Sequence, residues 1–159
     1  MEPRIDMANV APGAYKAMGG LEVYLRHCGL EESLLHLLKL RTSQINGCAF
    51  CLDMHWKDLK SIGEPDQRLY SLDAWRETPF YSDRERAALA WTEAITKVTE
   101  GHVPDEVFEQ VKAQFSEKEI ADLTLAVVTI NAWNRISIAT RVVTGTYQPI
   151  KKKELQPAV

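Results

Sequence analysis

The chain has 159 residues, of which 45% are hydrophobic and 26% are charged, a composition typical of one soluble globular domain. Its net charge of −3 offers no basic surface for a nucleic acid, and no stretch approaches the roughly 20 apolar residues that a membrane span requires. We therefore expect one domain over residues 1–159, with a tail from about residue 148, and neither nucleic-acid nor membrane binding.

The first half of the chain predicts three helices, because its apolar residues repeat with helical rather than strand periodicity. Residues 12–27 predict a helix that is weakened or interrupted at Gly19-Gly20. The next helix covers 31–45 and ends at Asn46-Gly47, since both residue types tolerate the left-handed conformation that closes a helix. A third helix is expected from about Cys48 to Ser61.

The second half predicts short helical turns over 66–78 and then three further helices. Ser82 with Glu85, and Ser116 with Glu119, form capping boxes that begin two of them. Pro104 opens the helix between these two. The last helix is apolar on most of its circumference, as expected at a bundle centre or a subunit interface. The sequence thus predicts an all-α bundle of six to eight helices, and the apolar last helix favours assembly into a homo-oligomer.

The segment QINGCAFCLDMHWK, residues 44–57, contains the pattern that points to chemistry. On a helix, Cys48 and Cys51 are neighbours on one face, and His55 lies one turn beyond Cys51. Both cysteines would sit in the first turn, where unpaired amides and the helix dipole lower a thiol pKa. The imidazole could then accept the thiol proton. The pattern therefore favours a redox-active dithiol.

Other uses of these side chains are less favoured. The acidic, polar N-terminus has no signal-peptide pattern, so we expect a cytoplasmic protein, where structural disulfides rarely persist. Zinc held by both sulfurs and His55 needs a fourth ligand from afar, such as Cys28 or His36. An iron–sulfur cluster normally needs four thiolates, and the chain has three cysteines. We expect no metal and no bound cofactor.

Residues 39–96, with C-x-x-C-x-x-x-H preceded by QINGC, resemble the AhpD (alkylhydroperoxidase D)-like branch of the carboxymuconolactone decarboxylase family. The resemblance implies an all-helical subunit that assembles into a trimer or hexamer. It also implies reduction of organic hydroperoxides. Cys51 would attack the peroxide, Cys48 would resolve it as a disulfide, and His55 would relay protons. A dithiol donor protein, for example one carrying a lipoyl group, would reduce the pair again.

The chain departs from this family pattern at two positions. Where the family usually has a relay glutamate, twelve residues before the first cysteine, this chain has His36, and Phe50 replaces a histidine before the second cysteine. His36 could replace the glutamate if its pKa stays near about 6.5. Otherwise a weakened peroxidase would act mainly as a dithiol–disulfide reductase. Helix-dipole reasoning alone favours Cys48 as the attacking thiol, whereas the resemblance favours Cys51.

Two other functions stay open at this point. One is a carboxymuconolactone decarboxylase-type lyase, which needs acid–base chemistry but no cysteine pair. The other is a non-enzymatic oligomer whose dithiol serves as a redox sensor or a zinc clip. Outside the motif, we expect Glu93 on a solvated helix face, Trp133 in the core or an interface, and Arg135 beside an acidic residue. His27 and His102 are expected at the surface.

Overall fold

The computed structural model describes residues 2–149, which form eight α-helices and two short 3-10 helices and no strand. The predicted tail lies almost entirely outside these residues. The helices are α1 (Met7–Val10), α2 (Pro12–Leu25), α3 (Glu32–Asn46), α4 (Ala49–Ser61), α5 (Asp66–Tyr70), η1 (Leu72–Glu77), α6 (Asp83–Thr96), η2 (Val98–Glu100), α7 (Asp105–Lys112) and α8 (Glu117–Thr140). The predicted all-α class is confirmed, and none of the described helices is long and apolar enough to cross a membrane.

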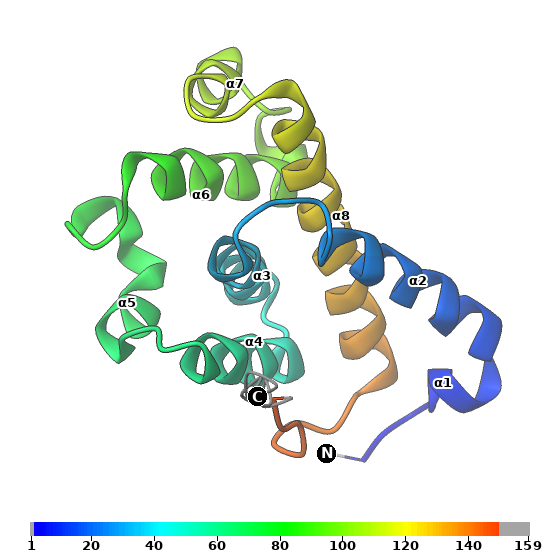
Figure 1. Ribbon diagram of the computed structural model, residues 1–159. Coiled ribbons are helices and arrows are strands. Elements are labelled where there is room, and N and C mark those ends of the chain that lie inside the picture. Colours follow the sequence, from blue (N-terminus) through cyan, green and yellow to red (C-terminus); the bar gives the residue numbers. More distant parts are fainter. Residues whose placement is uncertain (1, 150–159) are drawn as a thin grey trace, which may run out of the picture.

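Helix α3 lies at the centre of the molecule, and α4, α6 and α8 pack around it (Figure 1). Its leucines fall on several sides of the helix, and Leu34, Leu37, Leu38 and Leu40 are all buried. A helix that is apolar on several sides is stable only when neighbours cover it, which the surrounding helices do. Because α3 is mostly enclosed, polar side chains on it such as Lys39 and Ser43 pair with other residues of the bundle.

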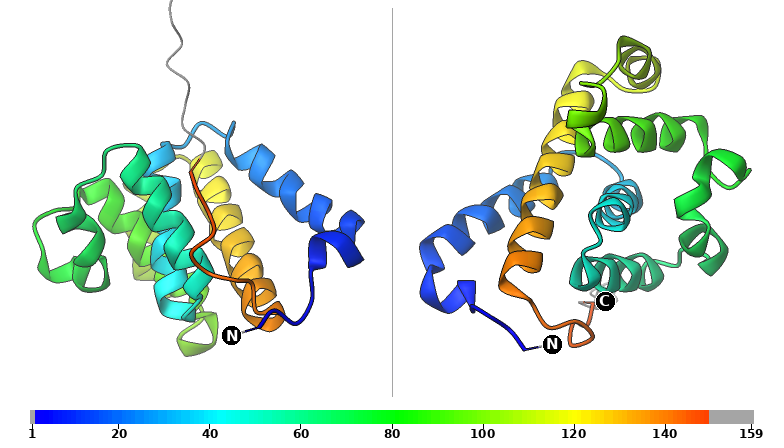
Figure 2. Two further views of the ribbon diagram at one scale, coloured as in Figure 1. Left: turned by 90° about the horizontal axis from the view of Figure 1, so that it is seen from below. Right: turned by 180° about the vertical axis from the view of Figure 1, so that it is seen from behind.

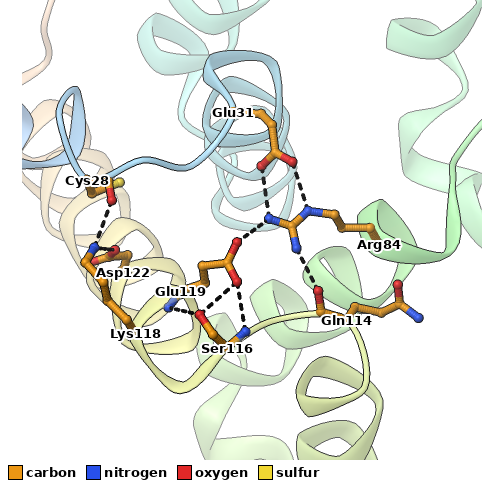
Figure 3. A network of polar contacts seen from close by, with 8 residues as sticks. All are labelled: Cys28, Glu31, Arg84, Gln114, Ser116, Lys118, Glu119 and Asp122. Carbon is orange, nitrogen blue, oxygen red and sulfur yellow. Dashed lines mark hydrogen bonds and ion pairs between the residues drawn. The ribbon is translucent and has the colours of Figure 1, made fainter.

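Two capping boxes and a shared arginine fix how α6 and α8 begin. The Ser82 and Ser116 hydroxyls each accept a hydrogen bond from the backbone amide of the third residue of their helix, a glutamate. The backbone amide of each serine donates to the side chain of that glutamate in return, as predicted. The Arg84 guanidinium on α6 then joins Glu31, just before α3, to Glu119 on α8 (Figure 3). The starts of three helices are therefore tied together at one end of the bundle.

Helix α2 packs along the outer side of α8, and Glu22 near its C-terminal end pairs with Lys39 of α3 (Figures 1 and 2). It is continuous from Pro12 to Leu25, so the predicted interruption at Gly19-Gly20 is wrong. Helical geometry is accessible to glycine at modest cost, and nothing crowds either position. Only Leu25 of this helix is buried. The described part of the chain therefore leaves most of the surface of α2 uncovered.

The segment that follows α8 returns across α4. Tyr147 accepts a hydrogen bond at its carbonyl from the Lys57 ammonium group, at 3.1 Å, and its hydroxyl donates to Asp58, at 2.6 Å. Figure 2 shows this segment, near the red end of the colour scale, running between α4 and α8. The returning segment is thus held against the second half of α4.

Candidate active site

The C-x-x-C pair stands at the break between α3 and α4. Gly47 ends α3 with φ 68° and ψ 33°, in the left-handed region, and the Cys48 amide donates to the Ser43 carbonyl at 3.1 Å. Cys48 is then the N-cap of α4, and its carbonyl accepts the first intrahelical bond, from Leu52. The predicted break and the predicted position of the pair at a helix N-terminus are confirmed.

Both thiols are buried, each with 1% of its surface exposed, and neither forms a disulfide. Hydrogen bonds from the Cys51 thiol and the Cys51 amide, with contributions from Asn134 and Ser137, outweigh burial and lower the pKa of Cys48 to about 7. The hydrogen bond to Cys48 and burial raise the pKa of Cys51 above its ordinary range. The pair therefore carries its first negative charge on Cys48, close to neutral pH.

Helix α8 holds the α3–α4 junction through side-chain amides. The Asn46 amide donates to Asn131 at 3.0 Å and to Asn134 at 2.9 Å. Asn134, which is fully buried, donates in turn to the Ser43 hydroxyl at 3.1 Å. Buried amides cost free energy unless they are paired, and here they pair with one another. This network places α8 against the residues that lead into Cys48.

His36 and His55 meet one turn further along α4 from the dithiol, together with a carboxylate that sequence reasoning did not single out. The two Nδ1 atoms lie 3.5 Å apart. Asp58 Oδ2 is 3.5 Å from His55 Nδ1 and 3.6 Å from His36 Nδ1. The Tyr147 hydroxyl donates to the other carboxylate oxygen of Asp58. His36 therefore lies beside His55, and the carboxylate of this cluster comes from Asp58.

Burial keeps both imidazoles uncharged at neutral pH. Burial and the neighbouring His55 lower the pKa of His36 to about 4, and burial lowers the pKa of His55. Burial alone would raise the pKa of Asp58, but hydrogen bonds from His55 and Tyr147 outweigh it and lower that pKa. His36 therefore does not have the near-neutral pKa on which its predicted role as a glutamate substitute depended.

His55 lies close to the dithiol along α4, but no hydrogen bond joins its imidazole to either thiol among the described residues. His55 is one helical turn after Cys51 and has 4% of its surface exposed. Its Nε2 atom is buried and has no hydrogen-bond partner among the described residues. Because Nδ1 faces Asp58, Nε2 is the ring atom left to exchange a proton.

An apolar cavity of about 270 Å³ lies beside the dithiol, between the N-terminal residues and α8. Phe50 and Trp133 line it, and both also pack against the cluster formed by Cys48, Cys51 and Ile130. Ser137 lines the cavity as well and contacts Cys48. A larger cavity, of about 330 Å³, is lined by Leu40, Trp56 and others but by none of the cysteines or histidines discussed above. Only the smaller cavity adjoins the thiols.

Several predicted side chains have other roles. Glu93 is not on a solvated face, because it accepts hydrogen bonds from Trp75, Arg41 and Arg76 and is mostly buried. Arg135 donates to Asn131 rather than to an acidic residue. His27 and His102 are exposed, as predicted. Trp133 packs on the dithiol cluster and edge-to-face against Tyr15, in agreement with a core or interface position.

Sequence reasoning missed four residues that touch the site: Asp58, Asn134, Ser137 and Tyr147. The spacing of three between His55 and Asp58 places both side chains on one helix face, so this contact could have been found. Tyr147 is 89 residues from Asp58, and no local pattern indicates that contact.

Comparison with known proteins identifies the family of this chain. The sequence profile of the Carboxymuconolactone decarboxylase family matches residues 11–94, which is more than half of the chain. The uncharacterized protein YdfG of Bacillus subtilis is 43% identical over 139 residues, covering 87% of this chain and 95% of YdfG. The chain belongs to the carboxymuconolactone decarboxylase family.

Solved structures of similar proteins share the fold. ATU0492 of Agrobacterium tumefaciens, a protein of unknown function provisionally assigned to AhpD-type antioxidant defence, is 44% identical. It superposes with a TM-score of 0.86 over 94% of this chain and 99% of its own. A peroxidase-related protein with an alkylhydroperoxidase AhpD core, from Ralstonia eutropha, is 17% identical, with a TM-score of 0.77 over 88% of this chain and 74% of its own. The debrominase Bmp8 is 19% identical, with a TM-score of 0.71 over 85% and 73%. The fold is therefore AhpD-like, and it occurs in proteins with more than one activity.

Proposed function

We propose that the protein is a thiol-dependent peroxidase that reduces organic hydroperoxides through Cys48 and Cys51. The observation that supports this most is the buried vicinal dithiol, in which the pKa of Cys48 is lowered to about 7 beside the neutral imidazole of His55. A thiolate is the nucleophile in thiol chemistry, and this pair forms one near neutral pH without a metal. The AhpD-like fold is consistent with this activity.

In the first step, the Cys51 thiolate attacks the outer peroxide oxygen. The O–O bond breaks, Cys51 becomes a sulfenic acid, and the alkoxide leaves and is protonated to an alcohol. The thiolate charge starts on Cys48, so Cys51 must first pass its proton to Cys48 or to His55 Nε2. We retain Cys51 as the attacking residue because it is the cysteine one turn from His55.

In the second step, Cys48 attacks the sulfur of the sulfenic acid, and hydroxide leaves as water once it is protonated. This forms the Cys48–Cys51 disulfide, for which the spacing on one helix face is suitable. A dithiol donor protein then supplies two electrons and two protons, and its own disulfide is the product. The sum of the reaction is one hydroperoxide and one dithiol converted to one alcohol, one water and one disulfide.

The apolar cavity supports an organic rather than a bare peroxide as the substrate. Its walls include Phe50, Trp133 and Ile136, which would accommodate a hydrocarbon group, and Ser137 leads to the thiols. We also propose that the protein is a homo-oligomer, a trimer or a hexamer, since α2 exposes much of its surface. The substrate, the dithiol donor and the assembly are all parts of the proposal.

The alternatives make different demands on the site. A dithiol–disulfide reductase would use the same cysteines without consuming peroxide. A decarboxylase-type lyase would need neither cysteine, and a redox sensor would oxidise once without turnover. The buried dithiol, in which the pKa of Cys48 is lowered, favours the two enzymes that use the dithiol over the lyase.

A turnover assay tests the proposal. The protein should consume cumene hydroperoxide continuously with dihydrolipoamide as the reductant, and Cys51→Ser should abolish this consumption. Cys28→Ser is the matched control, because Cys28 packs against the main core and is not in the dithiol cluster. Full activity in a Cys48→Ser/Cys51→Ser variant would refute the proposal.

A further inference from the structure

His36, His55 and Asp58 present three ligand-type atoms to one point. The three distances among His36 Nδ1, His55 Nδ1 and Asp58 Oδ2 are 3.5, 3.5 and 3.6 Å, so the atoms form a nearly equilateral triangle. Each distance exceeds the roughly 2.7–3.2 Å of a good N–H···O hydrogen bond. The hydrogen bonds among these side chains are therefore long, and the three atoms leave a space between them.

The spacing does match a metal ion at the centre. Ligand atoms arranged tetrahedrally, each about 2.1 Å from a zinc ion, lie about 3.4 Å from one another. Two imidazole nitrogens and one carboxylate oxygen are an established ligand set for such ions. We propose that His36, His55 and Asp58 bind one divalent cation of the zinc type, with its fourth position open to water.

The surroundings of the triad suit a cation. The Tyr147 hydroxyl binds Asp58 Oδ1 and leaves Oδ2 directed at the imidazoles, as an outer hydrogen bond does for a metal-binding carboxylate. The nearby Lys39 ammonium group is neutralised by Glu22 at 2.5 Å. The negative charge of Asp58 is therefore available to a bound cation. Neither cysteine belongs to this group of ligand atoms in the described chain, so the site is separate from a dithiol zinc clip.

Cation binding would control the dithiol through the tautomer of His55. A metal on Nδ1 uses the lone pair there and leaves the ring proton on Nε2. The peroxidase route in which Cys51 passes its proton to His55 needs the opposite tautomer, with Nδ1–H toward Asp58 and a free lone pair on Nε2. One ring cannot do both, so an occupied site prevents His55 from accepting the thiol proton. This regulatory part rests on the proposed peroxidase function, whereas the metal site does not.

The site is tested in a Cys48→Ser/Cys51→Ser protein, which lacks the dithiol as a competing zinc ligand. After treatment with a chelator, this protein should take one equivalent of zinc from a chromogenic indicator and should melt at a higher temperature with zinc present. Cobalt should give the strong visible absorption of a tetrahedral site without a thiolate charge-transfer band. Adding His36→Gln or Asp58→Asn should weaken zinc binding more than about 100-fold, and Tyr147→Phe by about tenfold.

His27→Gln is the matched control, since His27 is exposed and its Nδ1 atom contacts only the Val23 carbonyl oxygen. It should leave zinc binding unchanged. Far-ultraviolet circular dichroism of each variant separates a lost site from a lost fold. Absence of zinc binding in the folded double-cysteine variant, or binding that both His36→Gln and Asp58→Asn leave intact, would overturn the metal site.

The regulatory part is tested in protein with both cysteines. Stoichiometric zinc should slow disulfide formation by cumene hydroperoxide at least tenfold, and a chelator should reverse this effect. The His36→Gln protein, which lacks one of the three ligands, should be insensitive to zinc. Zinc binding with no effect on this rate would overturn the regulation but keep the site. A protein that is inert to peroxide even without zinc would overturn the proposed function, and the binding result would still stand.

Discussion

At the scale of single residues, Asp58 is the group that defines how His55 can act. Its carboxylate faces His55 Nδ1 and raises the pKa of that ring against the larger effect of burial. With the proton held on Nδ1, the lone pair is on Nε2, which has no other partner. His36 is uncharged at neutral pH, because its pKa is about 4, and it cannot supply the negative charge that the Asp58 carboxylate places beside His55. We therefore propose that Asp58 takes the role of the relay glutamate that the family resemblance led us to expect at position 36.

Replacing Asp58 by Asn should therefore weaken His55 as a base. We expect peroxide turnover of the metal-free enzyme to fall by on the order of 10- to 100-fold. This loss is no larger than the rate enhancement that a general base usually contributes. The pH at which activity declines on the acidic side should also change, which a purely structural role would not cause. Tyr147→Phe, which keeps the carboxylate, should reduce turnover less and destabilise the fold by about 1–2 kcal/mol. Equal losses in the two variants, with unaltered pH profiles, would contradict this role.

The Cys48 thiol should titrate near pH 7. Because its pKa is lowered, the thiolate is present above about pH 7 and disappears as the pH falls below that value. In a Cys28→Ser background, the ultraviolet absorbance of the thiolate should follow this curve. Cys51→Ala removes the strongest stabilising hydrogen bond and should move the Cys48 titration upward, toward an ordinary thiol. An unchanged titration in Cys51→Ala would show that another group stabilises the thiolate.

At the scale of elements, the junction between α3 and α4 makes the dithiol possible. Gly47 turns the chain in the left-handed conformation, and Cys48 can then start α4 with its amide bound to Ser43. Asn134 of α8 holds Ser43 from the opposite side. The thiols consequently stand at a helix N-terminus that is closed off from solvent.

Gly47→Ala tests the importance of this turn. Nothing lies within 4 Å of an added Cβ, so the cost comes from the positive φ and should be about 1–2 kcal/mol. Gly47→Asn should cost less, because asparagine tolerates that conformation. Denaturant unfolding measures both variants. If alanine and asparagine are equally harmless, the left-handed turn is not what holds the junction.

The sequence allowed the helices and the dithiol to be predicted, because their signals are local. Capping boxes at Ser82 and Ser116, and the Asn46-Gly47 stop, depend on residues a few positions apart. The contacts of Asn134 with Ser43 and of Tyr147 with Asp58 join residues about 90 positions apart, so no local pattern predicts them. The interruption expected at Gly19-Gly20 failed because a glycine pair weakens a helix without ending it.

At the scale of the whole molecule, α2 and α8 carry apolar side chains that residues 2–149 leave exposed. Valine, tyrosine and isoleucine residues with 45–70% of their surface exposed occur along α1, α2 and α8: Val10, Tyr15, Val23, Tyr24, Val128 and Ile138. Trp133, which covers the dithiol, contacts Tyr15 from this same side. Assembly over α2 would therefore enclose the cavity beside the thiols.

We predict that the purified protein is a trimer or a hexamer, as assembly would remove these apolar groups from water. Sedimentation velocity measures the state directly. Val23→Lys, an exposed change on α2, should shift it toward smaller species, whereas Arg135→Lys on the exposed side of α8 is a conservative control. A wild-type protein that sediments as a monomer at all concentrations would contradict the prediction.

The central claim is that Cys48 and Cys51 form a two-electron redox couple that peroxide oxidises. Its most direct test is intact-protein mass after one equivalent of cumene hydroperoxide and again after dihydrolipoamide. We predict the loss of two hydrogens, located by peptide mapping to a Cys48–Cys51 disulfide, and their return with the reductant. Dithiols that stay reduced in the presence of the hydroperoxide would contradict the claim.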